Sequence, residues 1–206
     1  MRARCRPDHA GVGVRAPSVG LVHSERMADD ARPGPPAQHL VIMGVAGSGK
    51  TTIAELLADR LGRPYAEADD FHPAANVRKM AAGIALTDED RWPWLRALRD
   101  WLTEQSRTGR SSIVTCSALR AAYRDVLGEA EGRIRFVHLT AAPEVIGDRL
   151  ASRVGHFMPA TLLPSQLDAL EPLRDSEDGV TVVVDEPPDV VADRVLEALG
   201  LGAGRA

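Results

Sequence analysis

The chain has 206 residues, a length that fits one domain with a substantial core. Hydrophobic residues make up 44% and charged residues 26%, and a net charge of −4 gives no reason to expect nucleic acid as the main partner. No apolar stretch approaches the length of a membrane span. The two cysteines, Cys5 and Cys116, lie far apart and do not indicate a disulfide framework, so the sequence predicts a protein of the reducing cytoplasm.

The first 38 residues differ in kind from the rest. They carry Arg, Pro, Gly and Ala without periodicity, end close to a Pro-rich stretch at 32–36, and contain no apolar run of the kind found in secretory signals. A segment that cannot bury apolar surface stays disordered. The sequence therefore predicts a disordered tail, residues 1–38, and one domain, residues 39–206. A start at Met27 and a weak targeting role for the tail both stay open.

The first predicted elements of the domain flank a glycine-rich loop. The apolar run Leu40–Met43 predicts a short buried strand, and residues 51–61 place apolar side chains on one face of a helix. The stretch between them matches every fixed position of a phosphate-binding loop. Its glycines let successive N–H groups turn inward on a phosphate, and the helix N-terminus adds partial positive charge.

This loop predicts a site for a nucleoside triphosphate. We expect Lys50 to reach the β- and γ-phosphates and the Thr51 hydroxyl to take a place on Mg²⁺. The expected cofactors are ATP and Mg²⁺. The loop residues expected to bind the nucleotide are Gly44, Val45, Ala46, Gly47, Ser48, Gly49, Lys50, Thr51 and Thr52.

The remainder alternates apolar runs with helical patterns, which is typical of a parallel sheet with helices on both faces. Thr87 and Asp90 resemble a capping box, and the helix after them carries tryptophans and leucines at helical spacing that we interpret as core. Pro143 fits the first turn of a later helix, and a last helix spans about 189–199. The further strands are expected near Pro64–Ala68, Ser112–Cys116, Ile134–Leu139 and Val180–Val184.

Acidic residues follow the second predicted strand. Ligands of open α/β sheets lie beyond the carboxyl ends of the strands, so Glu67, Asp69 and Asp70 should face the phosphates. A carboxylate there can hold Mg²⁺ through water, or orient an acceptor hydroxyl and take its proton. Asp69 shares a side with Glu67 if the strand continues that far, and strand alternation would turn Asp70 away.

A group of cationic residues follows the second and third strands in an otherwise acidic protein. Arginine favours carboxylates and phosphates because its guanidinium can bind both oxygens, so the group predicts an anionic acceptor. Farther on, Arg149 and Arg153 end a helix and enter a Gly- and Pro-marked loop with His156, which suits a lid over ATP. The cationic group comprises Arg78, Lys79, Arg91, Arg120 and Arg124.

With these segments in place, residues 39–200 resemble the gluconate kinases among the small P-loop kinases. Glu67 stands where those enzymes often have Asp, and Arg120 stands where Lys is common, but both changes preserve charge. The matching motifs are the loop GVAGSGKT from Gly44, ADDFHP from Ala68, NVRKM with Gly83, Leu86-Thr-Asp88, DRWPWL from Asp90, CSALR from Cys116 with Tyr123-Arg124-Asp125, HFMP from His156, Leu162-Leu163 and Ser165-Gln166.

The resemblance implies a three-layer P-loop kinase fold with a five-stranded parallel sheet, helices on both faces and a short lid at about 153–170. It implies transfer of the ATP γ-phosphoryl to the terminal hydroxyl of D-gluconate, which gives 6-phosphogluconate for carbohydrate catabolism. Lys50, Asp69 and Arg153 would be catalytic, with Arg149 also at the nucleotide and Thr51 and Glu67 at the metal. The residues implied for gluconate are Asp69, His72, Lys79, Arg91, Arg124 and His156.

Other functions remain to be weighed. The loop and fold also suit a shikimate- or nucleoside-monophosphate-type kinase. A GTPase switch usually needs an Asn-Lys-x-Asp element, and Asn76, the only asparagine, is followed by Val77. The third strand runs into Ser117 rather than an acid of Walker-B type, which disfavours a motor ATPase. The sequence allows a homodimer without deciding the oligomeric state, and it does not set the strictness for gluconate over other sugar acids.

Overall fold

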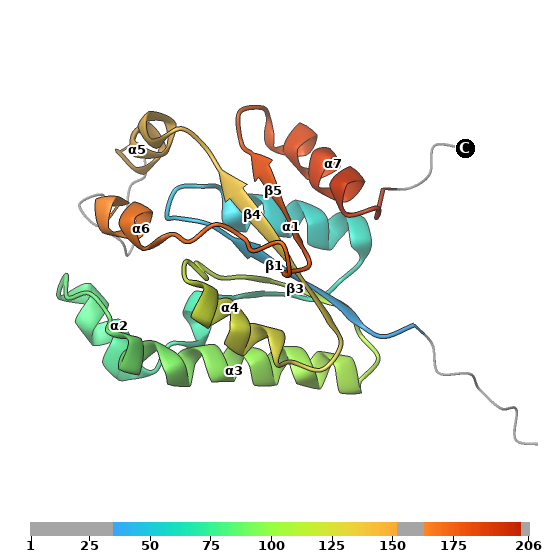
Figure 1. The fold of residues 1–206 in the computed structure, drawn as a ribbon, viewed down its shortest axis with the longest axis horizontal. Helices are drawn as coiled ribbons and strands as arrows, with labels where there is room; N and C mark the ends of the chain where they lie inside the picture. The colour runs from blue at the N-terminus through green and yellow to red at the C-terminus, as the bar shows by residue number, and fades with distance from the viewer. Residues whose placement is uncertain (1–34, 152–162, 203–206) are drawn as a thin grey trace, which may run out of the picture. The chain divides into compact units, whose positions relative to one another are not determined.

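The computed structural model describes residues 35–151 and 163–202. These residues form a five-stranded, all-parallel sheet in the order β2-β3-β1-β4-β5 (Figure 1). The strands are β1 (Gln38–Met43), β2 (Tyr65–Glu67), β3 (Ser112–Thr115), β4 (Arg133–Thr140) and β5 (Gly179–Val183). All five lie where the apolar runs predicted them, so the predicted fold class is confirmed. Gln38, the last residue of the expected tail, is the first residue of β1.

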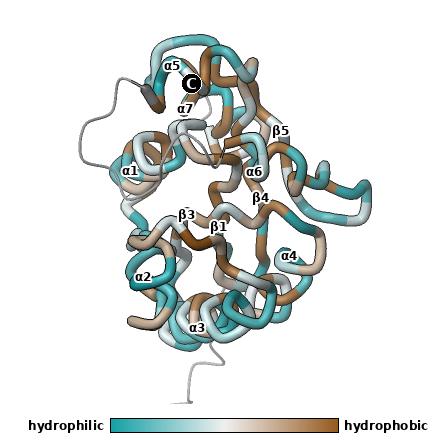
Figure 2. Tube along the Cα trace, turned by 90° about the vertical axis from the view of Figure 1, so that its left-hand side faces the viewer, coloured by the Kyte–Doolittle hydropathy of each residue, from teal (hydrophilic) through white to brown (hydrophobic). Residues whose placement is uncertain are grey.

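The helices form layers on the two faces of the sheet (Figures 1 and 2). None of the helices in the described ranges is long and apolar enough to cross a membrane. The helical elements are α1 (Lys50–Leu61), the 3₁₀ turn η1 (Ala68–Phe71), α2 (Ala74–Ala81), α3 (Asp88–Arg107), α4 (Ala121–Gly128), α5 (Pro143–Ala151), α6 (Leu163–Ala169) and α7 (Pro188–Ala198).

Strand β1 shows how the core is divided between the faces. Leu40 and Ile42 pack in the cluster that contains α1 and α7, whereas Val41 and Met43 pack in the cluster that contains α3 and α4. Successive side chains of a strand point to opposite faces, so a strand buried on both faces needs a continuous apolar run. All four of these side chains are fully buried, and β1 is consequently fixed as the central strand.

Two helices that the sequence did not predict, α2 and α4, have polar residues on their buried faces. Asn76 is the buried residue of α2, and its side-chain amide donates to the carbonyl of Asp90 at 2.8 Å. Arg124 is fully buried on α4 beside Tyr123 and Leu127. Apolar periodicity cannot reveal a helix that buries an amide or a guanidinium. By contrast, the capping box of α3 forms as expected, with Thr87 and Asp90 each accepting the other's N–H.

A buried histidine joins β1 to its neighbours. The ring nitrogens of His39 lie 2.7 Å from the hydroxyl of Ser112 and 2.7 Å from that of Ser106. Burial, assisted by the positive charge of Arg63, lowers the pKa of His39 to about 4. The folded protein therefore holds this imidazole neutral across a range of pH in which an unfolded chain would protonate it.

We expect this histidine to make stability depend on pH. Because the folded pKa lies below the ordinary value of 6.5, the unfolded state binds more protons between pH 6.5 and about 4, and stability falls as the pH falls through that window. Urea midpoints measured between pH 7 and 5 should decrease, and His39→Gln should flatten the decrease. The same slope in wild type and variant would contradict the assignment.

Candidate active site

The phosphate-binding loop leaves the carboxyl end of β1 and enters α1. Gly44, Gly47 and Gly49 have φ values of 141°, 80° and 89°, a region that favours glycine. A Cβ on Gly44 would lie 2.5 Å from the carbonyl oxygen of Leu139, and one on Gly47 would lie 2.9 Å from Leu150 Cγ. The loop is therefore enclosed by β4 and α5, with no space for a side chain at Gly44 or Gly47.

The loop and the start of α1 form an environment suited to an anion. The N-terminus of α1 directs N–H groups and partial positive charge toward the loop. Lys50 donates from Nζ to the carbonyl of Val45 at 3.0 Å, which holds its ammonium over the loop. The Ser48 hydroxyl is buried and lacks a hydrogen-bond partner among the residues that the structure describes. These groups fit a chain of phosphates, and Thr51 is exposed in the first turn of α1.

Glu67 is the last residue of β2, and its carboxylate accepts hydrogen bonds from the hydroxyls of Tyr65 and Thr115. Burial, followed by the hydrogen bond to Glu67, raises the pKa of Tyr65, so the phenol stays protonated and donates. The two hydroxyls come from β2 and the adjacent β3, which fixes the carboxylate at the edge of the sheet. Ionised carboxylates have about four acceptor positions, so Glu67 can still accept from a metal-bound water.

One premise about the acids is wrong. The strand ends at Glu67, and Asp69 and Asp70 lie in the 3₁₀ turn η1 rather than in a continued strand. Strand alternation therefore does not separate them. A 3₁₀ turn has three residues per turn, so consecutive side chains are about 120° apart around its axis. The carbonyl of Ala68, at the start of the turn, accepts from the Trp94 indole at 2.7 Å, which anchors the turn to α3.

The charges of Lys50 and Asp69 meet around Cys116, at the end of β3. Burial raises the pKa of the Cys116 thiol to about 12, the positive charge of Lys50 lowers it, and the negative charge of Asp69 raises it. Both charges are therefore near the same buried thiol. The phosphate-loop lysine and the first η1 acid thus both lie within electrostatic range of the end of β3.

His72 continues this site toward α3. Its ring stacks on Trp94 with centroids 4.3 Å apart and an interplanar angle of 14°. Burial lowers the pKa of His72, the carboxylate of Asp69 opposes that shift, and the charge of Arg91 adds to it. The lowered pKa favours the neutral imidazole near pH 7, and the ring feels the opposite charges of an acid and a guanidinium.

Arg91 belongs to a compact polar cluster around Tyr123. Its Nη1 lies 3.2 Å from the Tyr123 hydroxyl, which in turn donates to Asp88 at 2.6 Å. Arg120 donates to the other oxygen of Asp88 at 2.9 Å. Both guanidiniums lie over the Tyr123 ring, 5.6 and 5.9 Å from its centroid. Two guanidiniums share one carboxylate, which leaves an excess of positive charge on this wall of the site.

Lys79 lies close to the same wall but is engaged by α3. Its ammonium is 2.7 Å from each carboxylate oxygen of Asp90. The hydrogen bond from Lys79, with that from the Thr87 N–H, lowers the pKa of Asp90. Asp90 thus serves both the capping box and this ion pair, which joins α2 to the start of α3.

The structure gives Arg124 a role other than the predicted contact with substrate. Its side chain has no exposed surface and makes two hydrogen bonds, of 2.6 and 3.0 Å, to the carboxylate of Glu177. It also donates to the carbonyls of Ala118, Glu171 and Pro172 at 3.2, 3.1 and 2.9 Å. These bonds use its planar donors on the protein itself, so Arg124 joins α4 to the segment before β5 and is not presented to a ligand.

The remaining predicted residues lie around α5 and α6. Arg149 on α5 donates to the carbonyl of Val184 at 3.1 Å. Arg153 and His156 lie outside the described residues. The sequence motifs contained Asp88, Tyr123 and Gln166, but no role was derived for them because their contacts involve residues far away in the chain.

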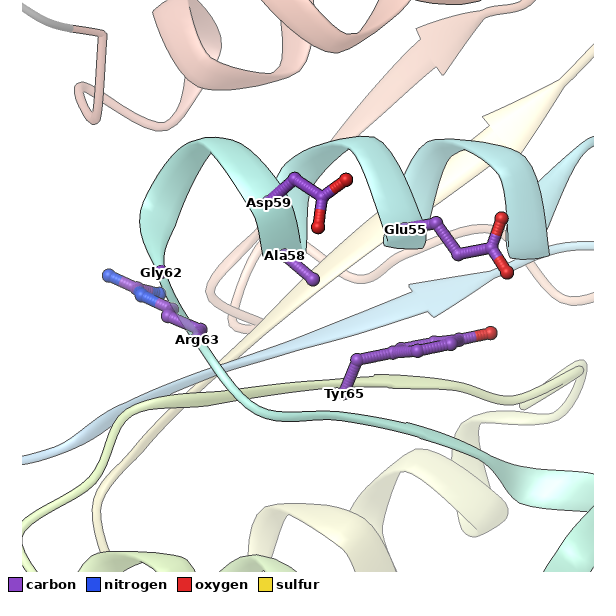
Figure 3. A pocket seen from close by; sticks show the side chains of 6 residues that line it. All are labelled: Glu55, Ala58, Asp59, Gly62, Arg63 and Tyr65. Carbon is purple, nitrogen blue, oxygen red and sulfur yellow. The ribbon is translucent and has the colours of Figure 1, made fainter.

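A separate cavity of about 630 Å³ lies between α1 and β2 (Figure 3). It contains none of the predicted site residues. Its lining residues are Glu55, Ala58, Asp59, Gly62, Arg63 and Tyr65.

The protein has the parallel sheet of a P-loop kinase, with the phosphate loop after its central strand. Glu67 lies at the end of β2 in the same sheet. The sequence pattern of the AAA domain family matches residues 40–157. A gluconokinase of Gluconobacter oxydans is 49% identical over 157 residues, which cover 76% of this chain and 88% of that protein. The chain belongs to the gluconokinase family.

Solved structures agree with this membership. A sugar kinase from Janibacter sp. HTCC2649 has a TM-score of 0.76 and 48% identity, covering 82% of this chain and 99% of its own. A gluconokinase from Sinorhizobium meliloti 1021 has a TM-score of 0.71 and 41% identity, covering 81% of this chain and 93% of its own.

Because Arg124 is buried and bonded within the protein, Arg124→Leu should affect stability far more than substrate binding. Removing one partner of a buried ion pair leaves the other uncompensated, which typically costs about 3–5 kcal/mol. Burial raises the pKa of Glu177, but hydrogen bonds, chiefly from Arg124, lower it by more, so the pKa is lowered overall. The measurement is urea unfolding, with the exposed Arg174→Gln, which breaks a pair with Asp125, as a control of little effect. Normal stability with a raised KM for the acceptor would restore a substrate role.

Proposed function

We propose that the protein transfers the γ-phosphoryl group of ATP to the terminal hydroxyl of D-gluconate, giving 6-phospho-D-gluconate and ADP. The observation that carries this proposal is a cationic wall beside a complete phosphate loop, in a chain whose relatives are gluconokinases. The loop supplies the ATP site, and the wall supplies charge for a sugar acid. The product would enter carbohydrate catabolism through the pentose phosphate pathway.

On the donor side, Lys50 would neutralise charge on the β- and γ-phosphates. Electrostatic groups that are already in place when charge develops give the largest catalytic contributions. The N–H groups of the loop would hold the phosphates in line with the acceptor. Thr52, next to Thr51 in the first turn of α1, would also bind the nucleotide. Arg149, and Arg153 on the sequence alone, would complete the cationic surroundings of the transferring group.

Mg²⁺ is proposed as the metal of the reaction. No group of three His, Cys, Asp or Glu side chains that could hold a metal occurs in the described ranges. Protein sites commonly bind Mg²⁺ through one or two oxygens together with substrate phosphates and waters. Thr51 would supply one oxygen and Glu67 would accept from a metal-bound water. When bound, Mg²⁺ would reduce the charge on the phosphates.

On the acceptor side, Asp69 would orient the terminal hydroxyl and accept its proton. Support comes from its electrostatic effect on His72 and on Cys116, the thiol on which the charge of Lys50 also acts. The neutral His72 would hydrogen-bond a sugar hydroxyl, and Arg91 would bind the carboxylate, with Arg120 adding charge. Lys79 at the edge of the wall and His156, on the sequence alone, would add further contacts. Bidentate binding of a carboxylate by a guanidinium favours acids over neutral sugars.

Two wider proposals accompany the reaction. A cytoplasmic location suits an enzyme that consumes ATP, and the free, buried Cys116 fits a reducing compartment. A homodimer is proposed from the family resemblance, and sedimentation of the full chain would decide between monomer and dimer.

A panel of acceptors tests the proposed reaction. We expect ADP release, measured by a coupled assay, with gluconate far above that with shikimate, nucleoside monophosphates or neutral glucose. The comparison with other six-carbon sugar acids would measure the strictness for gluconate. Preferred turnover of shikimate or of a nucleoside monophosphate would contradict the proposal.

A second experiment tests the base. Asp69→Asn should lower kcat with gluconate by about 10²–10⁴-fold, the usual contribution of a general base, while nucleotide affinity changes little. Asp70→Asn should be much milder, because it lies about 120° farther around the 3₁₀ turn. Steady-state kinetics and nucleotide titration of both variants provide the comparison. A severe loss in Asp70→Asn with a mild one in Asp69→Asn would exchange the two roles.

A further inference from the structure

A side chain of the short helix α6 makes a hydrogen bond to the phosphate loop. The backbone N–H of Ala46 donates to Oε1 of Gln166 at 2.7 Å, across a separation of 120 residues. Because a backbone N–H can only donate, the Gln166 amide must present its oxygen to the loop. The bond joins the middle of the loop to a helix that lies far away in the sequence.

Apolar packing holds α6 beside the loop. Val45, Leu119 and Ile146 form a buried cluster, and Leu163 and Leu167 of α6 pack against it. A hydrogen bond next to such apolar surroundings is stronger than one in water, and its geometry is more restrictive. The apolar contacts therefore bring the helix close, while the Gln166 amide fixes its position relative to one particular N–H.

The segment that follows α6 is also fixed. The N–H of Glu171 donates to the carbonyl of Leu119 at 2.7 Å, and its carboxylate accepts from the N–H of Ala121 at 2.6 Å. Arg124 binds the carbonyls of Glu171 and Pro172. Gln166 is consequently carried by a helix whose C-terminal continuation is bonded to α4.

The phosphate loop needs such external support. Three of its residues, Gly44, Gly47 and Gly49, lack side chains that would restrict the backbone. Other hydrogen bonds at the loop are Gly44 N–H to Ser117 at 3.4 Å, Ser48 N–H to Val45 at 3.3 Å and Lys50 Nζ to Val45 at 3.0 Å. The bond to Gln166 is shorter than these three, and it reaches the middle of the loop.

We propose that Gln166 is a positioning residue for ATP. By accepting the Ala46 N–H, it holds the segment Val45–Gly47 in the conformation in which the other loop N–H groups converge on the phosphates. A site that is ordered before binding loses less conformational freedom when the ligand arrives. The proposal rests on the ATP-dependent reaction proposed above, and it assigns Gln166 to nucleotide affinity rather than to the transfer step.

The experiment compares Gln166→Met with wild type in the full-length protein. Methionine has a similar length but no amide oxygen, so the apolar packing of α6 stays while the bond to Ala46 is lost. A lost hydrogen bond of ordinary strength should raise the Kd and KM for ATP by about five- to tenfold. The kcat and the KM for gluconate should stay within about twofold, and the thermal midpoint should change little.

Two further variants control the result. Asp168→Asn, on an exposed position of α6, should leave all constants unchanged. Gln166→Leu also removes the amide oxygen while keeping an apolar side chain of similar size, so it should weaken ATP binding by about the same factor. This variant decides the matter if Gln166→Met does not fold.

Unchanged ATP affinity in Gln166→Met, or a fall in kcat with unchanged ATP affinity, would overturn the inference. So would ATP affinity at the wild-type level in Gln166→Leu. Failure of the proposed reaction would look different. The wild type would then bind ATP without phosphorylating gluconate, and the effect of Gln166→Met on ATP affinity would remain.

Discussion

The burial of β1 on both faces is the constraint on which the rest of the structure depends. Its side chains enter both clusters of the core, so the strand cannot shift without disturbing both layers of helices. The phosphate loop begins where this strand ends, and it is closed in by the carbonyl of Leu139 and by Leu150. Glycine at positions 44 and 47 is therefore required both by the backbone conformation and by the space. A rigid central strand thus fixes the position of a loop that has few side chains to fix itself.

Burial separates two kinds of arginine within the predicted cationic group. Arg124 is fully buried and satisfied by a carboxylate and carbonyls, whereas Arg91 and Arg120 are partly exposed and share Asp88. A buried guanidinium with complete partners stabilises a particular packing, and a ligand cannot reach it. A partly exposed pair with excess charge can accept a further anion. Position in the sequence could not separate these kinds, because Glu177 is 53 residues from Arg124.

The sequence predicted those parts of the fold whose signals are local. Apolar runs located all five strands, and Thr87 with Asp90 located the start of α3. The helices α2 and α4 escaped prediction because Asn76 and Arg124 interrupt their apolar faces. The orientation of the acids escaped it as well, since the change from strand to 3₁₀ turn after Glu67 depends on tertiary contacts such as that of Trp94 with Ala68. The position of the acids after β2 at the same edge of the sheet as the phosphate loop was expected, because parallel strands end at one edge.

The segment between β3 and α4 links the donor and acceptor sides of the site. The Ser117 carbonyl accepts from the loop residue Gly44, and Leu119 packs against Val45. Ala118 has a φ of 41°, a costly conformation for a residue other than glycine, and its carbonyl accepts from Arg124. Two residues farther, Arg120 reaches Asp88 on the acceptor wall. A backbone held in this way cannot move at one end without moving the other. The guanidinium of Arg124 therefore holds, from within the protein, a segment that contacts both the phosphate loop and Asp88.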